Sequence, residues 1–180
     1  MNKEELIKTL RIVPDCPSKG IMFIDITTML KNADAVEEVT NRLYELYKEK
    51  GVTKVVGLES RGFIFAPILA NKLHVGFVPI RKPGKLPADT IEQSYTKEYG
   101  KDTLQMHKDA INENDIVLIH DDLLATGGSM KAACDLVKQM NPKKILINFV
   151  IELTNLNGRK VFDENIEVDS LLYCSEEEEV

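Results

Sequence analysis

Residues 116–129, IVLIHDDLLATGGS, decide the fold of this chain. The first four are apolar and three of them are β-branched, which predicts a buried strand over residues 116–120. Two adjacent carboxylates, Asp121 and Asp122, stand at the carboxyl end of that strand. A turn of small residues then opens a helix, whose apolar stripe has spacings of three and four: Met130, Ala133, Val137 and Met140. The stretch therefore predicts a strand, an acid pair, a glycine turn and a helix in succession.

Strands and helices alternate along the rest of the chain. The pattern predicts strands over residues 54–58, 75–80, 144–152 and 168–173, and helices near the N-terminus, over 34–50 and over 63–73. We expect Asp34 to begin the second helix through a capping box with Glu37, and Pro67 to lie in or near the first turn of the third. This alternation predicts an α/β fold with a mostly parallel twisted sheet flanked by helices, in one domain over residues 1–180.

Composition limits the class of protein. The 180 residues are 43% hydrophobic and 29% charged, which suits one compact domain with a sizeable core. No apolar stretch approaches the roughly 20 residues that cross a bilayer, and the N-terminus lacks the apolar core of a secretory signal. The net charge of −6 argues against a nucleic-acid surface, so we expect neither nucleic acid nor a membrane as partner.

The cysteines and the last residues add two expectations. Cys16, Cys134 and Cys174 are odd in number, far apart and without metal-site spacing. They therefore predict free thiols and a cytoplasmic location. The glutamates before Val180 predict a solvated acidic tail over residues 176–180.

The turn over residues 125–129 has the features of a phosphate site. Backbone N–H groups at the start of a helix lack intrahelical partners, and the helix dipole favours negative charge there. The glycines allow close backbone approach, and the hydroxyls add donors: Thr126, Gly127, Gly128 and Ser129. The turn has no Gly-Lys-Ser/Thr sequence, so it is not a P-loop.

The acid pair extends this interpretation from a phosphate to a sugar phosphate. When ionised, Asp121 and Asp122 accept hydrogen bonds only, so they match the vicinal hydroxyls of a ribose or the water shell of Mg²⁺. Ligands of parallel sheets bind beyond the carboxyl ends of the strands, where this pair is expected. The sequence therefore predicts a sugar-phosphate site at this edge of the sheet.

Two further segments carry positive charge in this acidic chain. Residues 57–62, GLESRG, form a second strand-to-turn junction, in which Arg61 can grip phosphate oxygens bidentately. Residues 81–87, RKPGKLP, place Arg81, Lys82 and Lys85 within five positions. By themselves the two segments are also compatible with a surface ion pair and a solvated basic loop. Beside the first turn, they predict a diphosphate site.

Taken together, five segments resemble the type I phosphoribosyltransferases, and among them the members that use adenine. The segments are RIVPDCPSKGIMFIDITTML (11–30), GLESRG (57–62), RKPGKLP (81–87), SYTKEYG (94–100) and DDLLATGGS (121–129). They follow the family's order and spacing from about Arg11 to Gly158. Sister enzymes for orotate, hypoxanthine or uracil share the acid pair and glycine turn, but not the Pro-Asp-x-Pro…Phe-x-Asp-Ile-Thr pattern of the first segment.

The resemblance implies an activity. Such glycosyltransferases of purine salvage transfer the 5-phosphoribosyl group from 5-phosphoribosyl pyrophosphate (PRPP) to adenine, giving AMP and pyrophosphate. They use Mg²⁺, and the resemblance implies a homodimer. Two alternatives stay open. One is transfer to hypoxanthine, guanine or xanthine. The other is a PRPP-sensing regulator without catalysis, although such proteins usually add an N-terminal DNA-binding domain and only ten residues precede Arg11 here.

The resemblance also implies the PRPP-binding residues. It places the 5′-phosphate on Ala125, Thr126, Gly127, Gly128 and Ser129, and the ribose hydroxyls on Asp121 and Asp122. It places pyrophosphate on Ser60, Arg61 and Gly62, with Lys82 and Lys85 assisting, in part from a neighbouring subunit. Mg²⁺ is then held mainly through PRPP and water, with Asp121 and Asp122 as the candidate protein ligands. A cis peptide bond is expected between Glu59 and Ser60.

For adenine, the resemblance implies a hood over residues 11–30. Backbone groups at Met22 and Ile24 then read the Watson–Crick edge of the base, although several relatives have Arg where this chain has Ile24. Phe23 and Leu123 are the candidates for packing against the base. A position in the ordinary core is the alternative for Phe23.

The resemblance makes residues 92–108 a flexible catalytic loop that closes as a hairpin and excludes water. Glu98 is the expected general acid/base near adenine N7 or N9, with Tyr99 positioning it and Arg61 as the third catalytic residue. A solvent-exposed carboxylate is the alternative for Glu98. His120 replaces an aliphatic residue usual in the family. Because side chains alternate along a strand, we expect His120 on the face opposite Asp121, as a packed, hydrogen-bonded histidine.

Overall fold

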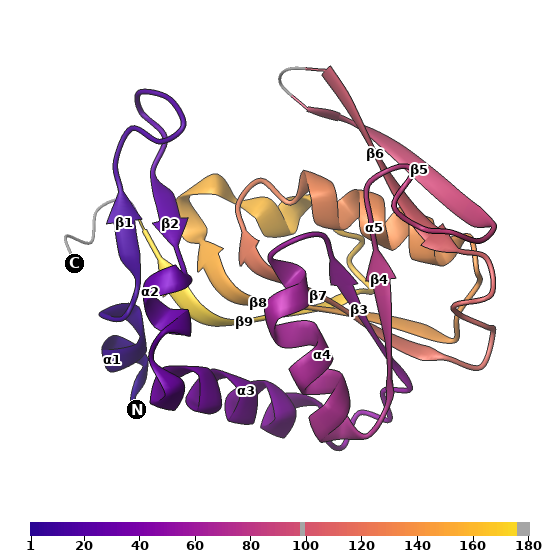
Figure 1. The fold of residues 1–180 in the computed structure, drawn as a ribbon, viewed down its shortest axis with the longest axis horizontal. Helices are drawn as coiled ribbons and strands as arrows, with labels where there is room; N and C mark the ends of the chain where they lie inside the picture. Colours follow the sequence, from indigo (N-terminus) through magenta and orange to yellow (C-terminus); the bar gives the residue numbers. More distant parts are fainter. Residues whose placement is uncertain (98–99, 176–180) are drawn as a thin grey trace.

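The computed structural model describes residues 1–97 and 100–175 and is built on a five-stranded sheet. The strand order is β4-β3-β7-β8-β9, and each strand is parallel to its neighbours. The strands are β4 (Gly76–Ile80), β3 (Lys54–Leu58), β7 (Ile116–Leu124), β8 (Lys144–Leu153) and β9 (Glu167–Cys174). The predicted parallel sheet is confirmed, and Figure 1 shows the strands running toward one edge of the molecule.

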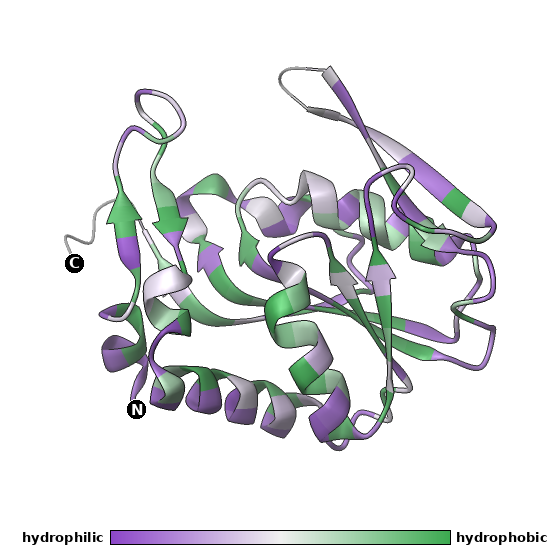
Figure 2. Cartoon of the chain, in the orientation of Figure 1, coloured by the Kyte–Doolittle hydropathy of each residue, from purple (hydrophilic) through white to green (hydrophobic). Residues whose placement is uncertain are grey.

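Helices cover both faces of this sheet. Helices α3 (Ala33–Tyr47) and α4 (Gly62–Leu73) pack on one face, with Leu43 and Phe65 in that core. Helix α5 (Gly128–Lys138) packs on the other face, with Met130 and Val137. Figure 2 shows the hydrophobic run of β8 and the two-sided colouring of α3. The short elements are α1 (Lys3–Ile7), α2 (Thr27–Leu30), and the 3₁₀ helices η1 (Thr154–Leu156) and η2 (Gly158–Val161).

The predicted start of α3 was wrong, whereas that of α4 was close. Asn32, not Asp34, is the N-cap of α3, because its side chain accepts from the N–H groups of Asp34 (3.1 Å) and Ala35 (3.2 Å). Asp34 instead lies in the first turn, where the helix dipole favours a carboxylate. Helix α4 begins at Gly62, one residue before the expected start, and Pro67 lies near its first turn, as expected.

Strand β7 is longer than expected. It continues through the acid pair to Leu124, because β8 goes on pairing with it after β3 has ended. The last β7 partner of β3 is His120, whereas Asp121 still pairs with Phe149 of β8. The acid pair therefore lies within the strand, with β8 on one side and the turn after β3 on the other.

Two small antiparallel units rise from the edge where the parallel strands end (Figure 1). The hood contains β1 (Arg11–Val13) paired with β2 (Phe23–Asp25). The predicted hairpin is present as β5 (Thr90–Lys97) and β6 (Gly100–His107). Among the described residues, no helix has the length and apolar character needed to cross a membrane. The expectations for Glu98, Tyr99 and the acidic tail lie outside the described residues.

Candidate active site

The turn over residues 125–129 joins β7 to α5, as predicted. Gly127 has a φ of 83°, and a Cβ there would lie 2.6 Å from the carbonyl oxygen of Gly158, so only glycine fits. Gly128 has no such restriction, since a Cβ at that position would meet nothing within 4 Å. With Asp121 and Phe149, the turn lines a pocket of about 110 Å³ at the N-terminus of α5. The geometry suits an anion held by backbone N–H groups.

A second glycine, Gly158, is not among the predicted site residues and packs against the back of this turn. A Cβ on Gly158 would lie only 2.2 Å from the carbonyl oxygen of Ala125. The next residue, Arg159, donates from Nε to both carboxylate oxygens of Glu152 at 2.8 Å, and from Nη1 to the Val168 carbonyl at 2.6 Å. Burial alone would raise the pKa of Glu152, but Arg159 and the Ser170 hydroxyl outweigh it and lower that pKa. The signal available in sequence was a Gly-Arg pair soon after a strand that ends in Glu.

The second turn, between β3 and α4, lies directly against the acid pair. The peptide bond between Glu59 and Ser60 is cis, as expected. A Cβ on Gly62 would lie 2.9 Å from the His120 carbonyl oxygen and 3.2 Å from Asp121 Oδ1. Glycine at this position therefore lets the backbone of the second turn approach β7. The two predicted anion-binding turns converge on one edge of the sheet.

Arg61 connects this second turn to both the acid pair and the hood. Its Nε donates to Asp122 Oδ2 at 2.6 Å, and its Nη2 donates to the carbonyl oxygen of Ile24 at 3.2 Å. The guanidinium also lies 5.2 Å from the centroid of the Phe23 ring. The Asp122 side chain is only 5% exposed, so its charge is balanced by Arg61 rather than by water.

Side chains alternate between the two faces of β7 along His120, Asp121 and Asp122. Asp121 lines the small pocket at the glycine turn, whereas Asp122 faces Arg61. Burial raises the pKa of Asp121 well above its ordinary value, and the charge of Asp122 adds to this effect. His120 is fully buried, its Nδ1 lies 2.7 Å from Asn148 Oδ1, and burial lowers its pKa to about 4. The prediction of a packed, hydrogen-bonded histidine is confirmed.

The hood residues divide between the core and the surface. Ile24 is 1% exposed, so its side chain belongs to the core and only its backbone faces Arg61. Phe23 is 37% exposed, so the core alternative for Phe23 was wrong. Met22 lines a cavity of about 760 Å³ between hood loop, hairpin and glycine turn, whereas Leu123 packs at the edge of the core. The cavity is lined by Pro17, Ser18, Gly20, Ile21, Met22, Tyr95, Thr96, Ala125, Thr126, Gly128, Ser129, Leu153 and Leu156.

The basic segment is attached to the second turn through Glu59. Arg81 donates to both carboxylate oxygens of Glu59 at 3.2 Å, and the backbone N–H of Lys82 donates at 2.9 Å. The Lys82 N–H and the Arg81 guanidinium hold the pKa of Glu59 below its usual value. The ammonium of Lys82 pairs with Asp102 of β6, and the carbonyl of Lys85 accepts from Arg81 at 3.3 Å. The expected cations thus lie beside the second turn, one of them in contact with the hairpin.

Comparisons with known proteins agree with this geometry. Residues 25–170 match the family described as phosphoribosyl transferase domain. The adenine phosphoribosyltransferase of Bacteroides fragilis is 62% identical over 174 residues, which cover 96% of this chain and 98% of that protein. That of Chloroflexus aurantiacus is 51% identical over 160 residues, which cover 89% of this chain and 92% of that protein.

Solved structures agree as well. The crystal structure of adenine phosphoribosyltransferase from Thermoanaerobacter pseudethanolicus superposes with a TM-score of 0.92 at 43% identity, covering 96% of this chain and 100% of that one. The Saccharomyces cerevisiae enzyme, crystallised with an imino-altritol bisphosphate and adenine, gives 0.88 at 42% identity, covering 94% and 98%. This chain therefore belongs to the phosphoribosyltransferase family, among the adenine phosphoribosyltransferases.

Proposed function

We propose that this chain transfers the 5-phosphoribosyl group of PRPP to adenine, giving AMP and pyrophosphate in purine salvage. One observation carries the proposal: two anion-binding turns, distant in sequence, meet at a pair of carboxylates through Gly62 and Arg61. PRPP has a phosphate at one end, a diphosphate at the other and two hydroxyls between them. A relative at 62% identity that is named for this reaction supports the same conclusion.

Different residues bind different parts of PRPP in this proposal. The turn over residues 125–129 holds the 5′-phosphate, and Asp121, which faces its pocket, accepts from a ribose hydroxyl together with Asp122. The turn over residues 60–62 holds pyrophosphate, with Arg61, Lys82 and Lys85 supplying positive charge. As the bond to the anomeric carbon breaks, negative charge grows on pyrophosphate, and these cations stabilise it.

Mg²⁺ belongs to the proposal as a metal bound through substrate. Among residues 1–97 and 100–175, no cluster of three or more His, Cys, Asp or Glu side chains could hold a metal. Asp121 and Asp122 are the residues that would hold the ion. A pair of carboxylates fits Mg²⁺, which keeps several waters and is usually bound through substrate phosphates and one or two carboxylates. When bound, the ion neutralises charge on the departing pyrophosphate.

Adenine binds under the hood in this proposal. The backbone at Met22 and Ile24 reads the Watson–Crick edge, and Phe23 and Leu123 pack against the ring. The exposed Phe23 ring over Arg61 supports this arrangement, because it borders the second turn rather than filling the core. Glu98 acts as the general acid/base, positioned by Tyr99, while the hairpin excludes water that would otherwise intercept the oxocarbenium-like transition state.

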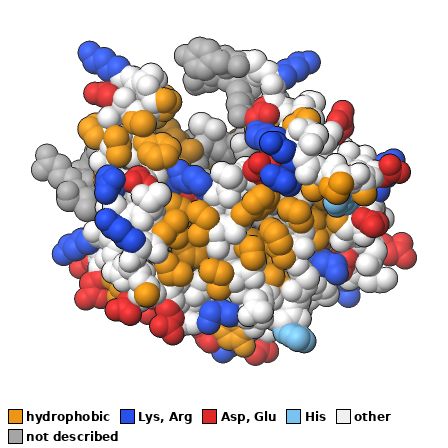
Figure 3. Space-filling model, in the orientation of Figure 1, with side chains coloured by type: hydrophobic (Ala, Val, Ile, Leu, Met, Phe, Trp, Pro, Cys, Tyr) orange, Lys and Arg blue, Asp and Glu red, His pale blue; other side chains and the backbone are white. Residues whose placement is uncertain are grey.

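Assembly and location complete the proposal. We infer a homodimer, because hydrophobic side chains gather over α4 on the face shown in Figure 3, and Ile68 of this helix is 38% exposed. Sedimentation equilibrium of the purified protein tests the dimer. We also infer a cytoplasmic enzyme, because Cys16, Cys134 and Cys174 are all free thiols.

A direct assay tests the activity. The protein is incubated with PRPP, Mg²⁺ and one base at a time, and the nucleotides are separated by chromatography. We expect AMP from adenine, with a kcat/KM at least about 10²-fold above that for hypoxanthine, guanine or xanthine, since a base edge read by hydrogen bonds discriminates strongly. Preference for another base would support the alternative purine activity. PRPP binding without turnover of any base would support the regulator.

A further inference from the structure

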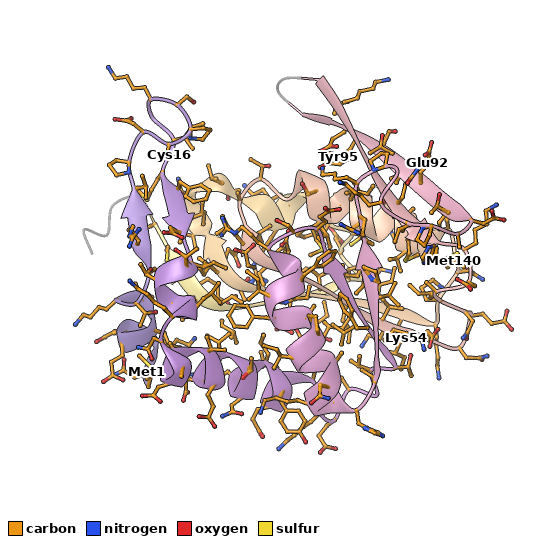
Figure 4. The ribbon with its side chains drawn as sticks, in the orientation of Figure 1. Met1, Cys16, Lys54, Glu92, Tyr95 and Met140 are labelled. Atoms are coloured by element: carbon orange, nitrogen blue, oxygen red, sulfur yellow. The ribbon has the colours of Figure 1, made fainter. Side chains whose placement is uncertain are left out.

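Tyr95, which is not among the predicted site residues, contacts the glycine turn from the hairpin. Its hydroxyl lies 3.1 Å from Ser129 Oγ and 3.1 Å from Asp102 Oδ2. Tyr95 is on β5 opposite Asp102 on β6, and its half-buried ring packs against the core around α5. Figure 4 shows Tyr95 on the part of the hairpin that passes over α5. The hairpin is thus joined to residue 129 by a side-chain hydrogen bond.

The Tyr95 hydroxyl has one proton and lies equally far from Asp102 and Ser129, so it can donate to either of them. A phosphate oxygen only accepts, so Ser129 must donate its own proton to the phosphate. The Ser129 oxygen can then accept from Tyr95. Asp102 also accepts the ammonium of Lys82. A continuous line of polar contacts therefore runs from the glycine turn, through the hairpin, to the basic segment.

These contacts lie inside the candidate site. Tyr95, Thr126 and Ser129 all line the cavity of about 760 Å³, which Met22 borders on the hood side. A serine hydroxyl without a fixed partner would occupy several rotamers. A partner that selects one of them removes an entropic cost that phosphate binding would otherwise carry.

We propose that Tyr95 is a positioning residue for the 5′-phosphate. It orients the Ser129 hydroxyl and docks the hairpin on the glycine turn. This inference rests on the proposed function for the identity of the phosphate, which is the 5′-phosphate of PRPP or AMP. Tyr95 acts through Ser129, so its contribution depends on the Ser129 hydroxyl and on a phosphate in the ligand.

The test replaces only the hydroxyl, in Tyr95→Phe, and measures binding of AMP, adenosine and inorganic phosphate by calorimetry. We expect about a five- to tenfold weaker affinity for AMP and for phosphate, the scale of one hydrogen bond. The affinity for adenosine, which lacks the phosphate, should change less than twofold. The matched control is Tyr44→Phe, which removes the same hydroxyl from α3, on the face of the sheet opposite α5. It should leave all three affinities unchanged.

A double-mutant cycle separates positioning from a general effect on the fold. In a Ser129→Ala background, Tyr95→Phe should weaken AMP binding no further. The proposal is overturned if Tyr95→Phe leaves AMP affinity unchanged, weakens AMP and adenosine equally, or acts fully in the Ser129→Ala background. A wild-type protein that forms no AMP from PRPP and adenine would instead contradict the proposed function, and inorganic phosphate would still test Tyr95.

Discussion

Arg61 Nε lies 2.6 Å from Asp122 Oδ2, across 61 positions of sequence. The contact fastens the turn after β3 to the strand that carries the acid pair, and Ile24 of the hood joins it through Arg61 Nη2. Three segments of the site are therefore held together by one guanidinium. A diphosphate that binds the second turn must share this guanidinium with Asp122, so binding and the internal ion pair are coupled.

The first prediction concerns that guanidinium. Arg61→Ala should lower kcat/KM for PRPP by at least about 10²-fold, the scale of losing one charge-stabilising donor. The change removes the proposed donor to pyrophosphate and leaves the nearly buried Asp122 without its cation. Steady-state kinetics measure the effect, with Arg42→Ala as control, since Arg42 pairs with Glu38 on α3. Wild-type turnover in Arg61→Ala would exclude Arg61 from the site.

The acid pair leads to a second prediction. Substituting Asp121 and substituting Asp122 should affect the stability of the protein differently. Asp121→Asn should keep or raise the midpoint of thermal unfolding, because burial already raises the pKa of Asp121 and disfavours its charged form. Asp122→Asn should cost roughly 1–3 kcal/mol, because it breaks a charge-assisted bond to Arg61. The double variant should remain folded and bind PRPP more weakly. Unchanged PRPP affinity by calorimetry would contradict the ribose role.

Gly158 provides a third prediction. In Gly158→Ala, the Cβ would lie 2.2 Å from the Ala125 carbonyl oxygen. This oxygen is a backbone atom, so it cannot move aside as the end of a flexible side chain could. We expect a loss of roughly 2–4 kcal/mol in the free energy of unfolding, as for other steric conflicts in a packed interior. The KM for PRPP should also rise, because the glycine turn must shift. Gly76→Ala is the control, since its Cβ would meet only the flexible Lys54 side chain at 3.3 Å. Equal effects of the two variants would disprove the argument.

Glu98, the proposed general acid/base, gives a fourth prediction, which rests on the family resemblance. Glu98→Gln should lower kcat by more than it weakens substrate binding, since a proton carrier contributes typically about 10²–10⁴-fold to rate. Single-turnover kinetics and calorimetry separate the two quantities. Glu92→Gln, which alters a β5 carboxylate that accepts from Gln105 at 3.1 Å, is the control. A rise in KM with unchanged kcat would make Glu98 a binding residue instead.

The cysteines allow a prediction about pH. Burial raises the pKa of the Cys134 thiol to about 12, so it remains protonated and unreactive in the native protein at pH 9. A disulfide reagent should modify the partly exposed Cys16 first, and all three thiols only after denaturation. The native Cys16→Ser variant should show no increase in thiol reaction between pH 7 and 9. Rapid reaction of a thiol other than Cys16 at pH 9 would contradict the buried position of Cys134.

Local sequence determined much of this protein. The apolar run before Asp121 specified a buried strand, and the glycines at 127 and 128 marked the turn into α5, because periodicity and turn chemistry act over a few residues. The expected hairpin over residues 92–108 is present, although its first strand begins earlier, at Thr90. His120 was placed correctly because side chains alternate along any strand. The family resemblance correctly indicated the cis bond at Glu59-Ser60.

Tertiary structure decided the rest, because it depends on neighbours distant in sequence. Strand β7 extends to Leu124 only because β8 continues beside it, and Asp122 faces Arg61 only because Gly62 lets the second turn approach. The contacts of Gly158 with Ala125 and of Tyr95 with Ser129 cross 33 and 34 positions, and no local pattern encodes them. Strand register and helix packing determine these long-range contacts. Residues at the edge of the sheet come together only when all the strands between them have paired in the correct register.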